Sequence, residues 1–384
     1  MIERSELLAF CDRLREPAAL RERRLEAFGR LAPAEHPSGL PVVPATDIHV
    51  SGGDEQIVAG PIGEMDDVHK KLAEAAWGGL LAVTNDLALL RHTAFLTAAH
   101  VIFIPPEWKG PAIRVQVRAS GPWSATGLLV LVGEGAQATI IDDLRGNAEV
   151  ASRAMEVIAT ERSRVEIVSV QSLMGSAATV FQRGRMEGEG SIIWRNASVG
   201  TAPLIQDLES TVSGDGGESS IDWLLYARGM ERHALSVRNI FAARGGSGEI
   251  AMKAVAEEKA HASLRGLIAI GLGGGGTDTY LTQEVLMLDP TSKVDAVPGL
   301  EIKTNDVKAS HSATVSRVTP EDLFYFASRG VEEREARRMF VEGFIGDLAG
   351  RITDAPAREA VLAIIAEKYL QARPTSGRTP EAVR

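Results

Sequence analysis

The pattern of apolar and polar positions divides the chain into three parts. Near the N-terminus, apolar residues recur at helical spacing and predict two helices. Their apolar faces carry Leu7, Leu8, Cys11 and Leu14 in the first helix and Leu20, Leu25, Phe28 and Leu31 in the second, with Pro17 at its first position. Over residues 76–315 helical periodicity is scarce, and short strand-like runs are separated by Gly, Ser, Asp and Asn. Beyond Thr319 the helical spacing returns.

The turns of the central part recur at a nearly constant interval. The turn markers, about 25–30 residues apart as in a solenoid, are Gly135, Arg162, Gly188, Gly216, Gly246 and Gly274. Each unit reads as strand, tight turn and strand, and one unit cannot cover its own apolar face, so the units must stack. The sequence therefore predicts a mainly β protein. We expect an N-terminal helical segment and linker over 1–75, a right-handed parallel β-helix over 76–315, and a C-terminal helical domain over 316–384.

The C-terminal part is predicted to hold three helices. Thr319 can cap the first, with Pro320 at its first position and Gly330 at its end. In the next two, apolar residues recur three and four positions apart. They are Ala336, Met339, Phe340, Gly343, Phe344 and Leu348 in the second helix and Val361, Leu362, Ile365 and Tyr369 in the third.

Composition excludes several classes of protein. The formal net charge of −10 argues against a nucleic-acid binder, which normally carries a basic patch. No apolar run approaches the length of a membrane span, and no signal peptide is evident, so we expect a cytoplasmic protein. The single cysteine, Cys11, excludes internal disulfides and a cysteine metal cage. Its thiol is expected to be buried, with a role as a sulfur ligand as the alternative.

The Gly-rich stretch 271–278 contains the pattern GxGxxG, which in a dinucleotide-binding fold opens a helix. Here the residues that follow, 279–288, alternate like a strand. We therefore interpret the stretch as a solenoid turn rather than a phosphate cradle. No Walker lysine follows it, so the chain is not itself an ATPase.

Residues 277–345 resemble the C-terminal signature of the SufB/SufD family of iron–sulfur cluster assembly proteins. The string over 306–314, Asp-Val-Lys-Ala-Ser-His-Ser-Ala-Thr, is closer to SufD than to SufB. The stretch 16–28 resembles the N-terminal motif of SufD-like proteins, without the tryptophan that the family usually has near Ala19. The resemblance implies a β-helix subunit that works by assembly with partners and is not an enzyme.

The resemblance also points to His311. None of the eight histidines forms a pair at metal-ligand spacing, but His311 lies in the most specific motif. The equivalent histidine of the family lies at the dimer interface and is implicated in iron or cluster handling. A neutral imidazole is a good ligand for ferrous iron, and interfacial hydrogen bonding is the alternative role.

Two departures from the family pattern bear on cofactors. SufB-like chains have a cysteine near Glu284, and SufD-like chains often have one at Ala309. Clusters need thiolate ligands, so we expect the isolated chain to hold no stable cluster and to share iron or a cluster transiently with a partner. Glu284 is a weaker candidate iron contact, with a surface charge as the alternative.

The implied partners are a SufB-like paralogue and a SufC-like ABC ATPase that docks on the C-terminal helices. Candidate docking residues are Phe324, Arg329, Glu335 and Met339. Two alternatives remain at this point. One is a secreted-type β-helix enzyme that acts on polysaccharide, and the other is a homodimeric SufBD relative that acts without a separate SufB.

Overall fold

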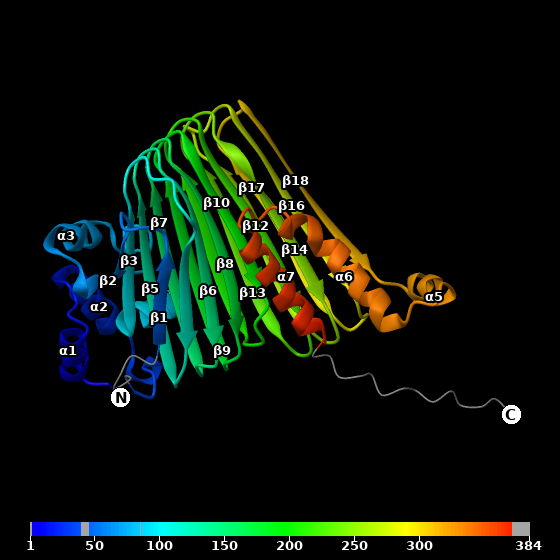
Figure 1. Ribbon diagram of the computed structural model, residues 1–384, viewed down its shortest axis with the longest axis horizontal. Coiled ribbons are helices and arrows are strands. Elements are labelled where there is room, and N and C mark those ends of the chain that lie inside the picture. Colours follow the sequence, from blue (N-terminus) through cyan, green and yellow to red (C-terminus); the bar gives the residue numbers. More distant parts are fainter. Residues whose placement is uncertain (1, 40–45, 85, 371–384) are drawn as a thin grey trace.

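The protein is built from two nine-stranded sheets that stack on one another, with helices at both ends (Figure 1). The computed structural model describes residues 2–39, 46–84 and 86–370. Sheet A consists, in spatial order, of β1 (Thr46–Gly52), β4 (Ile113–Ala119), β6 (Gln137–Gly146), β8 (Arg164–Leu173), β10 (Gly190–Ser198), β12 (Gly217–Ala227), β14 (Ser247–Ala256), β16 (Thr277–Met287) and β18 (Val307–Arg317). Sheet B consists of β17 (Lys293–Ile302), β15 (His261–Ile270), β13 (Arg232–Phe241), β11 (Leu204–Val212), β9 (Ala177–Met186), β7 (Val150–Ala159), β5 (Trp123–Val132), β3 (Ala98–Ile104) and β2 (Val58–Pro61).

From β3 to β18, successive strands alternate between the sheets, and neighbours within each sheet are parallel. Trp194 of β10 pairs with Ile167 of β8 and with Ile221 of β12. Paired residues of neighbouring parallel strands point to the same face of a sheet. Inward-facing residues at equivalent positions of successive coils therefore form a column between the two sheets. All three of these side chains are buried between the sheets. The predicted mainly β fold with a parallel β-helix core is thus confirmed.

Part of this interior is polar, which the sequence analysis did not predict. Asn196 Nδ2 donates to Gln182 Oε1 at 2.8 Å, and Trp223 Nε1 donates to Ser198 Oγ at 3.0 Å. Ser198 Oγ in turn donates to Gln206 Oε1 at 2.9 Å. Buried polar groups are tolerated when they are hydrogen-bonded to one another, and these bonds join strands of both sheets.

The Gly-rich stretch is a turn, as predicted. It connects β15, which ends at Ile270, to β16, which begins at Thr277. Gly276 has φ +80°, a conformation that glycine adopts without steric cost. The residues that would open a helix in a dinucleotide-binding fold form a strand instead.

The N-terminal end of the β-helix contains strands that the sequence analysis assigned to a linker. β1 pairs antiparallel with β4, and β2 pairs antiparallel with β3. β1 and β2 are short and lie among Gly and Pro residues, so the alternation of their apolar and polar residues was not recognised. The first parallel strand, β3, begins at Ala98, after a helix that lies within the range expected for the β-helix.

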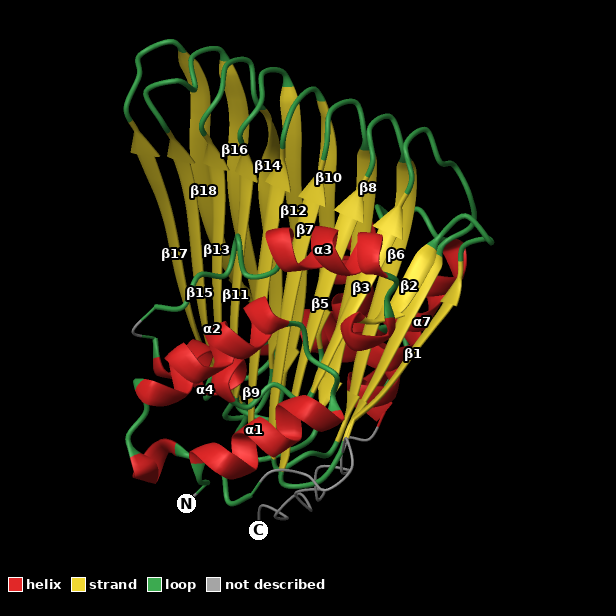
Figure 2. Ribbon diagram, turned by 90° about the vertical axis from the view of Figure 1, so that its left-hand side faces the viewer, coloured by secondary structure: helices red, strands yellow, loops and turns green. Residues whose placement is uncertain are grey.

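Helices lie around the two sheets and cover part of their outer faces. They are α1 (Arg4–Arg13), α2 (Ala18–Gly29), α3 (Asp67–Ala76), α4 (Leu87–Ala94), α5 (Pro320–Ser328), α6 (Glu333–Ala349) and α7 (Ala355–Leu370), with short 3₁₀ turns at Pro33–Glu35 and Ile62–Glu64. Figure 2 shows α1 to α4 in front of the strands at the end that carries β1 to β3. Leu20 of α2 packs there with Val101 and Leu129 of sheet B. On sheet A, Val341 of α6 and Ile365 of α7 pack over Val168, Leu224 and neighbouring residues.

The limits of α5 follow the predicted signals, but the buried face of α6 differs from the predicted stripe. Ala336 and Leu348 are buried as expected, whereas Val341 and Ile345 are buried in place of Met339, which is 44% exposed. Thr319 caps α5 by accepting a hydrogen bond from the backbone N–H of Asp322 at 3.2 Å, and Gly330 follows the helix with φ +80°. In α7, Val361, Ile365 and Tyr369 are buried as expected. Within the described ranges, no helix combines the length and apolar character that crossing a bilayer requires.

The N-terminal helices depend on a buried ion pair. The guanidinium of Arg24 binds the carboxylate of Glu16, with each side chain only 2% exposed, and its Nη1 donates to the carbonyl oxygen of Ala94 at 2.9 Å. We predict that Glu16→Gln lowers the free energy of unfolding by about 3 kcal/mol, because it leaves a buried charge without its counter-ion. Urea denaturation of the full chain measures this loss.

Asp12→Asn is the matched control. It makes the same chemical change in the Asp12–Arg21 pair, whose side chains are 66% and 34% exposed. Exposed pairs contribute little, so the expected change is within about 0.5 kcal/mol. Equal effects of the two substitutions would contradict the assigned role of the buried pair.

Candidate functional site

At the end of the β-helix opposite the N-terminal helices, each sheet ends in an edge strand that is paired on one side only (Figure 1). These strands are β17 and β18, and we call this surface the open end. Edge strands present N–H and C=O groups that another strand can pair with. β17 carries Pro298 in its middle, which removes one donor, whereas β18 has no Lys, Arg, Asp or Glu between Lys308 and Arg317. β18 is therefore the more suitable of the two edges for pairing.

His311 lies on β18, opposite Leu281 of β16. Leu281 is fully buried in the interior, so His311 occupies the inward-facing column at the open end. It is nevertheless exposed, because no further coil covers it. Val307 and Ala309 of the same strand pack partly against the interior, and Val315 is 52% exposed. Other inward-facing residues of β18, which include Val307, Ala309 and Val315, are thus apolar, and a partner could cover them.

Glu284 lies on the opposite face of sheet A from His311. Its carboxylate binds Lys253 Nζ at 2.9 Å, and the same ammonium group binds Asp347 at 2.8 Å. The structure does not bring Glu284 and His311 together. Glu284 instead helps to attach α6, the helix of Asp347, to sheet A. Among the residues that the structure describes, no group of three or more His, Cys, Asp or Glu side chains could hold a metal ion.

The four candidate docking residues lie on α5, just after it, and on the first half of α6. Phe324 is 75% exposed and Met339 is 44% exposed. Arg329 lies over the ring of Tyr325 at 5.6 Å, and Glu335 forms an exposed ion pair with Arg338 at 2.5 Å. Exposed aromatic and apolar side chains beside charges are typical of a protein-binding surface.

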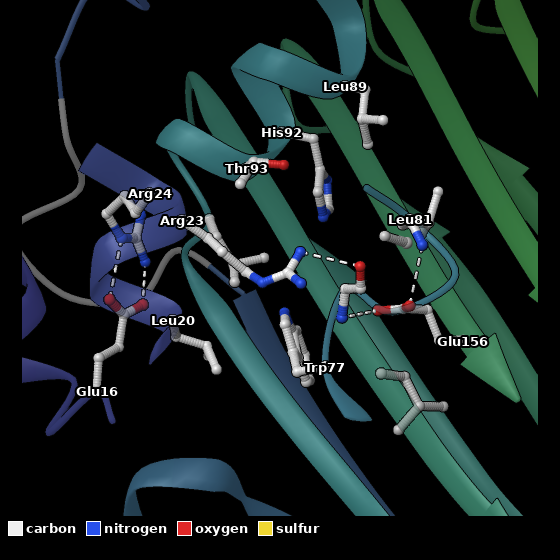
Figure 3. A pocket seen from close by; sticks show the side chains of 14 residues that line it. Glu16, Leu20, Arg23, Arg24, Trp77, Leu81, Leu89, His92, Thr93 and Glu156 are labelled. Atoms are coloured by element: carbon white, nitrogen blue, oxygen red, sulfur yellow. Dashed lines mark hydrogen bonds and ion pairs between the residues drawn. The ribbon is translucent and has the colours of Figure 1, made fainter. Parts of the chain in front are cut away.

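A small pocket of about 40 Å³ lies between the N-terminal helices and sheet B (Figure 3). Arg23 points into it and donates from Nη1 to the carbonyl oxygen of Gly78 at 2.9 Å. Glu156 of β7 accepts hydrogen bonds from the backbone N–H groups of Gly78, Leu80 and Leu81 at 2.6, 2.8 and 3.0 Å. Such a volume holds no more than a few water molecules.

Two titratable groups at this pocket have pKa values shifted by burial. Burial raises the pKa of Glu156, and the three backbone N–H groups oppose that shift. Burial lowers the pKa of His92 to about 3, with a further contribution from the charge of Arg153. His92 Nδ1 lies 2.8 Å from Ser152 Oγ. An imidazole with a pKa of about 3 is a very weak proton acceptor near neutral pH, so we interpret these contacts as the attachment of the helical segment to sheet B. No local sequence signal points to these contacts beyond a glutamate in a strand.

Cys11 is buried in α1, at the end of the molecule opposite β18 (Figure 1). Burial raises the pKa of its thiol to about 11. Because the thiolate is the form that binds metals and sulfur, this environment favours the packing role over the ligand role.

Comparisons with known proteins point to one family. The model of the SufBD core domain, described as SUF system FeS cluster assembly, matches residues 115–344. The iron–sulfur cluster assembly protein SufD of Bacillus subtilis is 24% identical over 286 residues, which cover 72% of this chain and 65% of the relative. An iron–sulfur cluster assembly SufBD family protein of Mycobacterium tuberculosis is 27% identical over 199 residues, which cover 52% of this chain and 24% of the relative. The matched region thus spans about a quarter of the mycobacterial relative and less than two thirds of the Bacillus protein.

The pKa of His92 leads to a testable pH dependence of stability. Its folded pKa, about 3, lies below the ordinary value of 6.5, so between these values the unfolded chain binds more protons than the folded chain. The free energy of unfolding should therefore fall as the pH decreases from 6.5 toward 3, by about 1.4 kcal/mol per pH unit from this histidine. His92→Gln should remove that part of the slope.

The measurement is urea denaturation of both proteins at several pH values between pH 4 and pH 7. His100, whose pKa is lowered by burial to about 4, contributes a slope of the same sign that remains in the variant. Identical slopes for the two proteins would show that His92 is not held neutral by burial.

Proposed function

The chain belongs to the SufBD family of iron–sulfur cluster assembly proteins, because the family's core domain matches residues 115–344, and from this premise we propose that it is a SufD-like subunit of an assembly complex. The family match favours this function over the polysaccharide-enzyme alternative. The observation that carries the proposal is the open end, where an edge strand without charged residues between Lys308 and Arg317 presents an exposed imidazole. In this proposal the chain is not an enzyme and works in the cytoplasm.

We propose that a SufB-like paralogue covers the open end. Pairing along β18 would satisfy its free N–H and C=O groups and bring His311 opposite the partner's side chains. The cluster needs thiolates, and the only cysteine of this chain, Cys11, is buried in α1. The thiolates would therefore come from the partner. Pairing with a second copy is the alternative, but it would add another His311 and no thiolate nearby.

The second proposed partner is a SufC-like ABC ATPase, docked on α5 and α6. The exposure of Phe324 and Met339 supports this surface, because these side chains are not needed for the protein's own core. Under this division of roles, the isolated chain holds no stable cofactor. Iron or a nascent cluster is the cargo that the chain shares with the paralogue.

The substitution that tests the proposed function is His311→Ala. If the imidazole contributes a ligand at the interface, the cluster content of the complex isolated from cells should fall by about tenfold, a size typical of a disturbed metal site. The yield of the complex should stay nearly unchanged, because His311 is exposed and not part of the core. Iron, sulfide and subunit ratios measured on the same preparations separate the two effects.

Ser312→Ala is the matched control on the neighbouring position of β18. Ser312 faces the other side of the sheet, where its hydroxyl binds Tyr280 at 2.8 Å. It should change neither cluster content nor yield appreciably. If cluster content in His311→Ala fell only in proportion to the yield of the complex, His311 would be a structural residue.

For the ATPase, we predict that Phe324→Ala combined with Met339→Ala weakens pull-down of the co-purifying ATPase by about tenfold or more, as for central interface residues. Leu272→Ala is the control, because Leu272 is 82% exposed but lies in the turn between β15 and β16. Point substitutions are preferable to removing the helices, since α6 and α7 cover the apolar face of sheet A. Full retention of binding would move the docking site elsewhere.

A further inference from the structure

The strand that carries His311 continues almost directly into the exposed helix α5. β18 ends at Arg317, α5 begins at Pro320, and Thr319 is the N-cap. Only Val318 separates the strand from the cap. Its N–H donates to the carbonyl oxygen of Met287 at 3.0 Å, and its side chain packs partly against the cluster under α6 and α7. Because the connection is so short, the position of α5 constrains the end of β18.

The helix that follows is fixed to the β-helix, whereas α5 is not. Arg337 of α6 donates from Nη1 to the carbonyl oxygen of Leu288 at 2.7 Å, and Lys253 binds Asp347 of the same helix at 2.8 Å. None of the nine residues of α5, all of them described, is buried. The joint to α6 contains Gly330, whose φ is +80° and around which an added Cβ would meet no described atom within 4 Å.

One aromatic contact holds α5 against this fixed helix. The rings of Phe326 and Phe340 lie 5.4 Å apart at 66°, an edge-to-face arrangement. Phe340 packs partly against the apolar cluster between α6, α7 and sheet A. Phe324 projects outward on the same helix and is 75% exposed. Phe326 and Phe324 therefore have different surroundings, because Phe326 faces α6 and Phe324 faces solvent.

We propose that Phe326 is a positioning residue for the open end. Through Phe340 it holds α5 in place, and through Thr319 and Val318 it thereby holds the C-terminal half of β18 on β16. This half of the strand is the part most prone to opening, because it pairs on one side only and its inward residue Val315 is 52% exposed. The functional importance of this inference rests on the proposed function, in which a partner bound to α5 would affect the position of the strand that presents His311.

Hydrogen exchange of the full-length protein tests the inference without any partner. Phe326→Ala should accelerate exchange of the backbone amides over residues 313–317 by about three- to tenfold, the effect expected for the loss of one aromatic pair. Exchange in β10 to β14, inside the β-helix, should stay unchanged. Phe326→Leu keeps an apolar contact with Phe340 and should restore most of the protection.

Phe324→Ala is the matched control, because it removes the same ring from the same helix without touching the contact to Phe340. It should leave exchange over residues 313–317 unchanged. Unchanged exchange in Phe326→Ala would overturn the inference, as would equal acceleration in the two variants or a uniform acceleration throughout the β-helix. Because exchange is measured on the isolated chain, failure of the proposed ATPase docking would be seen separately, in the pull-down of the Phe324 and Met339 variants.

Discussion

The burial of each coil against the next is the interaction on which the rest of this structure depends. A single pair of strands from sheets A and B encloses too little apolar surface to be stable, and it becomes stable only when equivalent inward residues continue the column. Trp194 between Ile167 and Ile221 is one example. Such a column has two ends, and at each end one coil must be covered by something else.

The two ends of the β-helix differ in how they are covered. At the N-terminal end, β1 and β2 pair antiparallel with the first coils, and α1 to α4 lie over sheet B. The carboxylate of Glu156 attaches the loop before α4 to β7, and the buried pair of Glu16 and Arg24 joins the connection between α1 and α2 to α2 itself. At the other end, β17 and β18 leave the column uncovered, so the last inward residues, His311 among them, face solvent. The column is thus covered at the N-terminal end and open at the other.

Much of this could be predicted from local signals in the sequence. Gly-rich turns such as 271–276 have a local cause, so their spacing revealed the coils, and Thr319 and Gly330 mark the limits of α5 for the same reason. Features that depend on distant partners could not be predicted. β1 is recognisable only through its pairing with β4, and the ion pair of Glu284 with Lys253 joins residues of two different strands. The polar interior around Asn196 was missed because inward polar residues interrupt the alternation that identifies a strand.

The antiparallel pairing of β1 has a consequence for how many copies can join. A β-helix with two similar parallel ends could stack head to tail without limit and grow into a fibre. Here β1 and β2, with the helices beside them, give the first end a geometry that does not match β17 and β18. If two open ends pair, the column continues across the contact, and such a two-fold arrangement uses up both open surfaces at once. Growth would then stop at two subunits, and a chain built from a repeating unit would form a finite particle.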